Sequence, residues 1–219
     1  MDRVTFEEML ELASLGSKVL HARAVEFASK YQVPLRVLST FVQGEGTLIT
    51  KEDKLNMEQP IISGIAFTKD EAKLTVLGVE DVPGIAWKIL GPISDANIGI
   101  DMIVQNVAAD NTTDFTFTVS RDDYHEAMDL LNQVAMDIGA RQVNGDDKIA
   151  KLSIVGVGMR SHAGVASKMF QVLADRSINI QMISTSEIKV SVVIAEEYIE
   201  LAARALHSVF NLEEKSIKS

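Results

Sequence analysis

Hydrophobic and polar positions follow one another in a pattern that occurs twice along the chain. Three blocks recur in the same order: residues 73–79 as 151–157, 84–90 as 164–170, and 98–103 as 178–183. The first block recurs after 78 residues and the other two after 80, so the second copy has a loop that is two residues longer. Self-similarity at a fixed period indicates an internal duplication. The sequence therefore contains two copies of one structural unit.

The first copy predicts a complete set of strands and helices. In chain order we expect a strand over 74–79, a helix over 85–96, strands over 100–107 and 113–119, a helix over 124–138 and a short strand over 140–143. The alternation of Phe115, Phe117 and Val119 is typical of a strand, and Gly139 is expected to close the second helix. Pro92 is expected to kink the first helix or to end it early. The order βαββαβ predicts an α+β, ferredoxin-like unit with both helices on one face of a four-stranded antiparallel sheet.

The second copy lacks its last strand. It predicts strands over 152–157, 180–185 and 190–195 and helices over 164–177 and 198–210, after which the chain becomes polar. A missing fourth strand would leave an unpaired sheet edge, which proteins usually avoid. Residues 61–67 form a strand-like run with no partner of their own. We therefore predict that 61–67 completes the second unit (61–67 plus 148–213), so that the first unit (72–147) is inserted within it.

Residues 1–56 follow a different pattern, which is typical of the last part of another domain. Thr5 to Glu8 have the spacing of a capping box, which opens a helix. A second helix is expected to run from Val19 to Ala28, followed by strands over 35–41 and 47–50.

Charge and hydropathy exclude several classes of partner. The chain carries a formal net charge of −10, nearly all of it in the repeated part. Because affinity for phosphate requires an excess of Lys and Arg, nucleic acid is not expected as a partner. No apolar run approaches the roughly 20 residues of a membrane span, and the acidic N-terminus is not typical of a signal peptide. A cytoplasmic protein without membrane contact is therefore expected.

The usual metal and nucleotide motifs are also not expected. The sequence has no cysteine, which excludes disulfides and thiolate ligands. Its four histidines lack the spacing of metal ligands. Residues 156–161 come near a dinucleotide-binding fingerprint, but Ser161 stands where that fingerprint ends in glycine. We therefore expect no metal site and no cofactor in this chain.

Five segments carry a resemblance to a known family. They are Val82-Pro-Gly-Ile-Ala86, Ile100-Asp-Met-Ile-Val-Gln-Asn106, Thr112-Thr-Asp114, Met159-Arg-Ser-His162 and Ile183-Ser-Thr-Ser-Glu-Ile188. With these segments the chain resembles the C-terminal half of bacterial aspartokinase over essentially its whole length, and the two repeats are similar to ACT domains. Residues 1–56 are similar to the end of that family's amino-acid-kinase domain, although Ala22 stands where the family has proline.

The resemblance implies a regulatory function. ACT domains sense amino acids, and those of aspartokinase mediate feedback inhibition, by lysine and/or threonine, of the pathway to lysine, threonine and methionine. The sequence lacks the nucleotide-binding segment of the kinase domain, so the chain alone is expected to be inactive, with ATP and Mg belonging to the full enzyme. The resemblance further implies a free regulatory subunit or a regulatory fragment, a homodimer formed through the ACT units, and a catalytic aspartokinase subunit as a partner.

An amino-acid effector needs partners for two charges. Its carboxylate suits the N–H groups at a helix N-terminus, and its ammonium suits a carboxylate or strand carbonyls. Each repeat has a strand–loop–helix junction with a glycine at the helix start, Gly84 in the first copy and Gly164 in the second. By resemblance, a threonine-type pocket would use Asp81, Gln105, Asn179 and Ile180. A lysine-type pocket would use Asp101, His162, Gly164, Val165, Ser186 and Glu187; no catalytic residue is expected.

Three alternatives remain open at this point. The ACT-like units could serve only for dimerisation, without binding an effector. Residues 1–56 could retain part of an active enzyme. Asp81 and the three residues after it also fit an ordinary turn, which would need no ligand.

Overall fold

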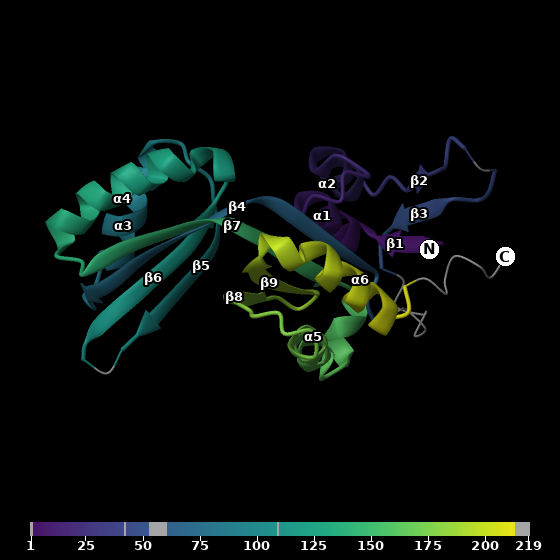
Figure 1. Ribbon diagram of the computed structural model, residues 1–219. Helices are drawn as coiled ribbons and strands as arrows, with labels where there is room; N and C mark the ends of the chain where they lie inside the picture. The colour runs from purple at the N-terminus through teal and green to yellow at the C-terminus, as the bar shows by residue number, and fades with distance from the viewer. Residues whose placement is uncertain (1, 42, 53–60, 109, 213–219) are drawn as a thin grey trace. The chain divides into compact units, whose positions relative to one another are not determined.

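The computed structural model describes residues 2–41, 43–52, 61–108 and 110–212 (Figure 1). The chain divides into two compact units. We call residues 69–150 the inserted unit, and residues 1–68 together with 151–219 the flanking unit. Among the described residues, no helix is both long enough and apolar enough to cross a bilayer.

The inserted unit has the strand order of a ferredoxin-like fold. It consists of β4 (Gly64–Glu80) from residue 69 on, α3 (Ile85–Asp95), β5 (Ile100–Val107), β6 (Thr112–Val119), η1 (Arg121–Asp123), α4 (Tyr124–Ile138) and β7 (Gln142–Val155) as far as residue 150. The sheet order is β5-β6-β4-β7, and β6 pairs antiparallel with both β4 and β5. Figure 1 shows α3 and α4 on the same face of this sheet. The predicted α+β, βαββαβ unit is therefore confirmed.

Alternating side chains build the core of the inserted unit. Phe117 lies opposite Leu74 and Phe115 opposite Val76 in the β4–β6 ladder, and all four side chains are buried. They pack against apolar residues of α3 and α4. Gly139 ends α4 in the left-handed conformation with φ of 68°, as the sequence predicts.

Pro92 does not end its helix. Helix α3 continues to Asp95, and the carbonyl of Pro92 accepts a hydrogen bond from the amide of Ala96 at 3.1 Å. The buried side chains of Ile89 and Ile93 hold both sides of the proline in the core, so tertiary packing outweighs the local cost of the ring.

The flanking unit contains the second ferredoxin-like sheet. It consists of the end of β7, η2 (Val157–Ser161), α5 (Val165–Ala174), β8 (Met182–Thr185), β9 (Lys189–Ala195), η3 (Glu196–Tyr198), α6 (Ile199–Val209) and the first residues of β4. The strand order is β4-β7-β9-β8, and β8 pairs antiparallel with β9. The amide of Ser63 donates to the carbonyl of Val155 at 2.7 Å, which places the chain before β4 beside the end of β7. Residues 64–68 of β4 thus supply the strand that the second copy lacks.

Two strands are longer than the sequence predicts. Residues 61–67 and 74–79 were expected as separate strands, but Gly64–Glu80 is one strand; likewise Gln142–Val155 replaces two predicted strands. Backbone hydrogen bonds of the ladder outweigh the turn propensity of Asp70, Gly145 and Asp146. Val157, expected in the strand, begins η2 instead, because its amide binds the Glu8 carboxylate at 2.9 Å.

The N-terminal part of the flanking unit forms a small sheet covered by two helices. Its elements are β1 (Arg3–Thr5), α1 (Phe6–Ser14), α2 (Ala22–Lys30), β2 (Leu35–Val37) and β3 (Thr47–Thr50). The sheet order is β1-β3-β2, with β1 parallel and β2 antiparallel to β3. Buried Phe6, Met9, Val25 and Ile49 share one apolar cluster.

Two boundaries in this part differ from the prediction. Helix α2 begins at Ala22 rather than at Val19, because the His21 ring accepts a hydrogen bond from the amide of Arg23 at 3.3 Å and so caps the helix. Strand β2 ends at Val37 rather than at residue 41, because its partner β3 has only four residues. The predicted capping box at α1 is confirmed.

Candidate functional site

Both ferredoxin-like sheets have the same backbone geometry at the start of the first helix. Gly84 precedes α3 with φ of 92°, and Gly164 precedes α5 with φ of 91°. A side chain is strongly disfavoured at such φ values, which explains the glycine in both copies. Within the described residues, no side chain caps either helix. The first N–H groups of α5 are therefore open to an anionic ligand group, whereas at α3 the Ile85 amide already donates to the carbonyl of Val82 at 3.2 Å.

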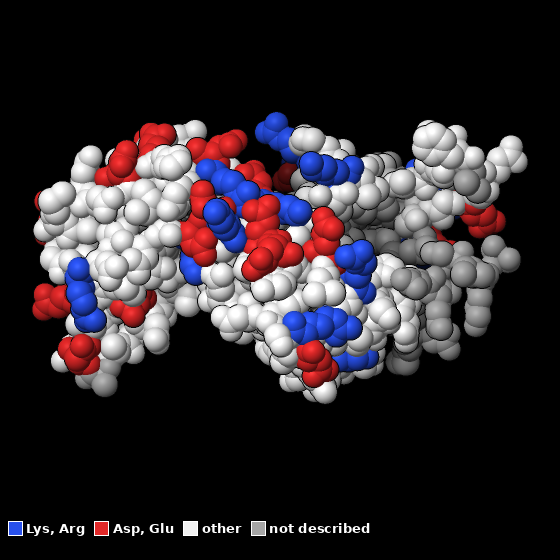
Figure 2. Space-filling view, in the orientation of Figure 1, with Lys and Arg blue, Asp and Glu red and all other residues white. Residues whose placement is uncertain are grey.

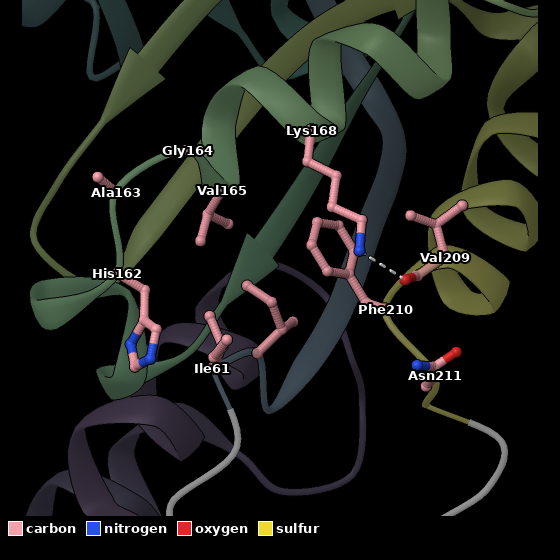
Figure 3. A pocket seen from close by; sticks show the side chains of 10 residues that line it. Ile61, His162, Ala163, Gly164, Val165, Lys168, Val209, Phe210 and Asn211 are labelled. Atoms are coloured by element: carbon pink, nitrogen blue, oxygen red, sulfur yellow. Dashed lines mark hydrogen bonds between the residues drawn. The ribbon is translucent and has the colours of Figure 1, made fainter.

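A cavity of about 450 Å³ lies at the start of α5 (Figure 3). It is lined by Ile61, Ile62, His162, Ala163, Gly164, Val165, Lys168, Val209, Phe210 and Asn211. Figure 3 shows His162 on one side of the cavity, with Lys168 and Phe210 on the other. The volume lies within the range typical of small-molecule sites.

The lining combines positive potential with apolar walls. The Lys168 ammonium donates to the carbonyl of Val209 at 3.1 Å and lies 5.2 Å from the centre of the Phe210 ring. The positive end of the α5 dipole lies at Gly164, on the same cavity. Such a site can hold a carboxylate at the helix start and an aliphatic chain against Val165 and Phe210.

The structure brings part of the lysine-type set together. His162, Gly164 and Val165 line the cavity, whereas Ser186 and Glu187 lie in the turn between β8 and β9. The amide of Ser186 donates to the carbonyl of Lys189 at 2.8 Å, which closes this turn. The Glu187 carboxylate is paired with Arg160, two residues before His162. Asp101 belongs to the inserted unit, on β5.

The threonine-type set is divided between the units. Asp81, directly after β4, and Gln105, on β5, belong to the inserted unit, and both are exposed. Asn179 and Ile180 belong to the flanking unit, between α5 and β8. The joining of these four residues in one pocket stays a prediction.

Hydrogen bonds order the loop beside Asp81. The Asp81 amide donates to the carbonyl of Asn111 at 3.0 Å. The hydroxyl and amide of Thr112 donate to Asp110 at 2.7 and 3.1 Å, and these bonds hold the pKa of the Asp110 carboxyl below its ordinary value. A turn does follow Asp81, but the bond that closes it runs from the Ile85 amide to the carbonyl of Val82 at 3.2 Å, and the side chain of Asp81 is exposed.

Sequence comparison identifies both repeats. Residues 73–135 match one model of the ACT domain and residues 152–210 match another. A solved structure of aspartokinase alpha and beta subunits has a chain that is 56% identical, with a TM-score of 0.65 over 68% of this chain and 99% of that one. The chain belongs to the aspartokinase family.

Further aspartokinases agree with this assignment. The regulatory subunit of aspartate kinase from Thermus thermophilus, solved in a ligand-free form, is 40% identical, with a TM-score of 0.64 over 68% of this chain and 97% of that one. An aspartokinase from Pseudomonas aeruginosa is 71% identical over 214 residues, which are 97% of this chain and 52% of that protein. The chain thus spans about half the length of the curated aspartokinases that it matches, and it corresponds to their tandem-ACT regulatory region.

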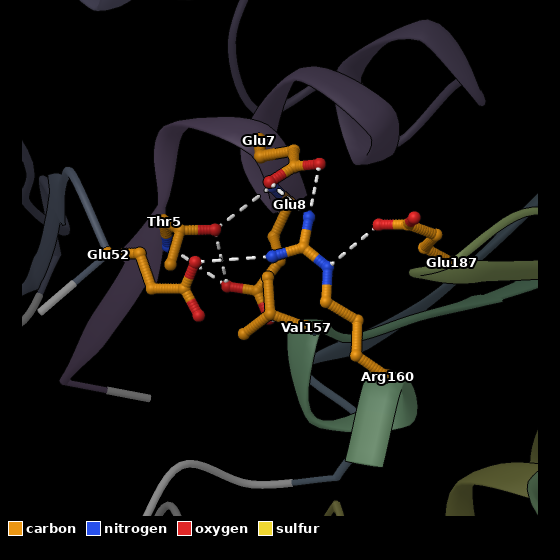
Figure 4. Close-up of polar contacts among 7 residues, drawn as sticks. All are labelled: Thr5, Glu7, Glu8, Glu52, Val157, Arg160 and Glu187. Carbon is orange, nitrogen blue, oxygen red and sulfur yellow. Dashed lines mark hydrogen bonds and ion pairs between the residues drawn. The ribbon is translucent and has the colours of Figure 1, made fainter. Parts of the chain in front are cut away.

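The chain also contains a polar junction that the sequence did not predict (Figure 4). Helix α1 directs Glu7, Glu8 and Glu11 at partners in the ACT part of the flanking unit. Glu11 pairs with Lys189 at 2.9 Å, next to the turn that carries Glu187. The spacing of residues 7 and 11 was visible in the sequence, but nothing local indicated their partners.

Glu8 is the buried centre of this junction. Its carboxylate accepts hydrogen bonds from the amide and hydroxyl of Thr5, both at 2.9 Å, from the amide of Val157 at 2.9 Å, and from the hydroxyl of Ser63. A buried carboxylate is stable only when its oxygens are satisfied in this way. Glu8 therefore caps α1 and also fixes it to the ACT sheet.

Arg160 is the cationic centre of the same junction. Its guanidinium contacts Glu7 at 2.8 Å, Glu52 at 3.2 Å and Glu187 at 3.3 Å. Partial burial alone would lower the pKa of Arg160, but these three carboxylates raise it above its ordinary value. The side chain therefore remains a cation at any pH at which the protein is folded.

The described residues form no metal centre, and the face drawn in Figure 2 carries mixed charges. No group of three His, Asp or Glu side chains there could hold a metal ion. On the face drawn in Figure 2, acidic and basic side chains lie next to one another. That face presents no broad surface of a single charge.

Proposed function

We propose that this region binds lysine and/or threonine and thereby mediates feedback inhibition of an aspartate kinase. The supporting observation is the open N-terminus of α5 at a cavity with an apolar wall. An α-amino acid offers a carboxylate for the amides after Gly164, and its side chain fits against Phe210. Its ammonium group suits a carboxylate or strand carbonyls, and Glu187 of the same unit is the candidate carboxylate.

Regulation requires that the effector binds one state of the enzyme more tightly than the other. An effector held by α5 would shift the parent kinase toward the state in which this cavity is best formed. Phosphorylation of aspartate, with ATP and Mg, belongs in this proposal to the whole protein. A catalytic aspartokinase subunit is the partner through which the effect would be read out.

Calorimetric titration of the chain with lysine and with threonine tests the proposal. We expect saturable binding of at least one of them, with D-lysine and glycine as ligand controls. Asp81→Ala should weaken threonine roughly tenfold, the loss of one hydrogen bond to a charged group, and leave lysine unchanged. His162→Ala should weaken lysine more than threonine.

The matched control is His125→Ala, which removes an exposed imidazole of α4 outside both sets. It should change neither affinity. If no amino acid binds the unmodified chain, the sensing function is wrong and an assembly module without effector binding is favoured. If Asp81→Ala weakens both ligands equally, the assignment of two separate pockets is wrong.

A further inference from the structure

A short loop connects the candidate cavity to helix α1. We call residues 157–164 the junction loop. At one end, the Val157 amide binds Glu8 of α1. At the other end, His162 and Gly164 line the cavity. The His162 ring lies 2.8 Å from the carbonyl of Gly158, so the loop folds back on itself between the two ends.

The contacts of the junction loop differ in how easily they can be exchanged. Glu8 is buried and fully hydrogen-bonded, and both carboxylate oxygens of Glu7 contact Arg160, at 2.8 and 2.9 Å. The contact of Arg160 with Glu187 is longer, at 3.3 Å, and the Glu187 side chain is 82% exposed. Exposed ion pairs contribute only about 0–1 kcal/mol, so Glu187 is the partner that Arg160 gives up most readily.

We propose that Arg160 is a positioning residue that releases Glu187 to an ammonium group of the bound amino acid. The inference rests on the proposed function, which places Glu187 in the effector set. Without effector, Arg160 joins Glu187 to Glu7 and Glu52 (Figure 4). With effector, Glu187 pairs with the ligand, and Arg160 keeps its two other partners. The junction loop then loses one tie to the β8–β9 turn but stays fastened to α1, so occupancy of the cavity weakens the link between α1 and that turn.

The exchange predicts that removing Arg160 and removing its partners Glu7 or Glu52 change the affinity for the effector in opposite directions. Removing Arg160 frees Glu187, which should tighten binding of an ammonium ligand. Removing Glu7 or Glu52 leaves Arg160 with fewer competing carboxylates, so it should hold Glu187 more firmly and weaken binding. These opposite effects follow because Arg160 and the ligand ammonium compete for Glu187: whatever strengthens one contact weakens the other. A residue with a purely structural role would not give opposite signs.

Calorimetric titration of the full chain with lysine and with threonine at low salt tests the exchange. For the effector that the unmodified chain binds, Arg160→Gln should lower Kd about two- to fivefold, the worth of one exposed ion pair. Glu7→Gln and Glu52→Gln should raise Kd by a similar factor, and Glu187→Gln should remove most of the binding. Arg204→Gln, an exposed arginine of α6, is the matched control and should leave Kd unchanged.

The outcomes separate this inference from the proposed function. If the unmodified chain binds an effector, but Arg160→Gln and both glutamate variants leave Kd unchanged or shift it in one direction, the exchange is wrong and sensing stands. If the unmodified chain binds neither amino acid, both are wrong. Thermal unfolding of each variant identifies any that is not folded, and Glu52→Gln gives the same sign test as Glu7→Gln at a second position.

Discussion

Glu8 combines two tasks that are usually given to different side chains. It closes the capping box of α1 through Thr5, and it accepts hydrogen bonds from Ser63 and Val157, which lie far along the chain. Removal of the carboxylate would leave all of these donors without an acceptor. A buried donor without an acceptor lowers the stability of the folded state. The attachment of α1 to the ACT sheet therefore depends strongly on one residue.

Glu8→Ala should lower the free energy of unfolding by about 3 kcal/mol or more, because it leaves several buried donors unsatisfied. Urea denaturation followed by circular dichroism measures the loss. The control is Glu7→Ala, on the same helical turn, where the carboxylate is half exposed and the expected loss is about 1 kcal/mol or less. Equal losses in the two variants would contradict the assigned role of Glu8.

The sequence could predict the local part of this site but not its tertiary part. The capping box and the glycines before α3 and α5 depend on neighbouring residues, and all three features are present in the structure. The partners of Arg160 lie 153 and 108 residues away for Glu7 and Glu52, so no local pattern could indicate them. Ion pairs between distant residues become visible only when the fold brings them together.

Helices and strands were predictable where a single hydrophobic periodicity covers the whole segment. Helix α4 and strand β6 match their patterns closely because each buries one regular face. The long strands β4 and β7 were predicted in pieces, because charged residues in their middle are typical of a loop. Their backbone pairing with each other is a long-range property, which overrides that local signal.

Directly after β7, the chain passes so close to the segment before β4 that only glycine fits at position 156. A Cβ at Gly156 would overlap the carbonyl oxygen of Ile61 and lie 2.8 Å from the Cα of Ile62. Both neighbours are backbone atoms, which cannot rotate away. This contact sets the spacing between the two segments just before the junction loop begins.

Gly156→Ala should therefore destabilise the chain by about 1–3 kcal/mol, the usual cost of overpacking. Gly99→Ala is the matched control, because no atom lies within 4 Å of a Cβ at that position, and it should change stability by about 0.5 kcal/mol at most. Thermal and urea unfolding of the two variants give the comparison. A stable Gly156→Ala protein would show that the two segments can move apart at little cost.

The exposed edge of the inserted unit favours self-association of the chain. Strand β5 is the outer strand of its sheet and exposes Ile103, Val104 and Val107. A sheet edge with exposed apolar side chains is a ready partner for another copy. This agrees with the predicted homodimer formed through ACT units.

Ile103→Lys should shift the chain from dimer toward monomer, because it places a charge on the exposed face of β5. Met136→Lys is the control: Met136 is also exposed and apolar but lies on α4, away from the edge strand. Sedimentation velocity over a range of concentrations distinguishes the two. A monomeric unmodified chain, with and without lysine and threonine, would contradict the dimer.

The division of the chain also sets an order of events during synthesis. The inserted unit is continuous, so all its strands and helices are available once residue 150 has left the ribosome. The first residues of β4 instead wait for the part of β7 from Lys151 on, after 82 intervening residues. At about 5–20 residues per second this delay lasts roughly 4–16 s. A nascent chain can therefore complete the inserted unit while the first residues of β4 are still waiting for the strand with which they pair.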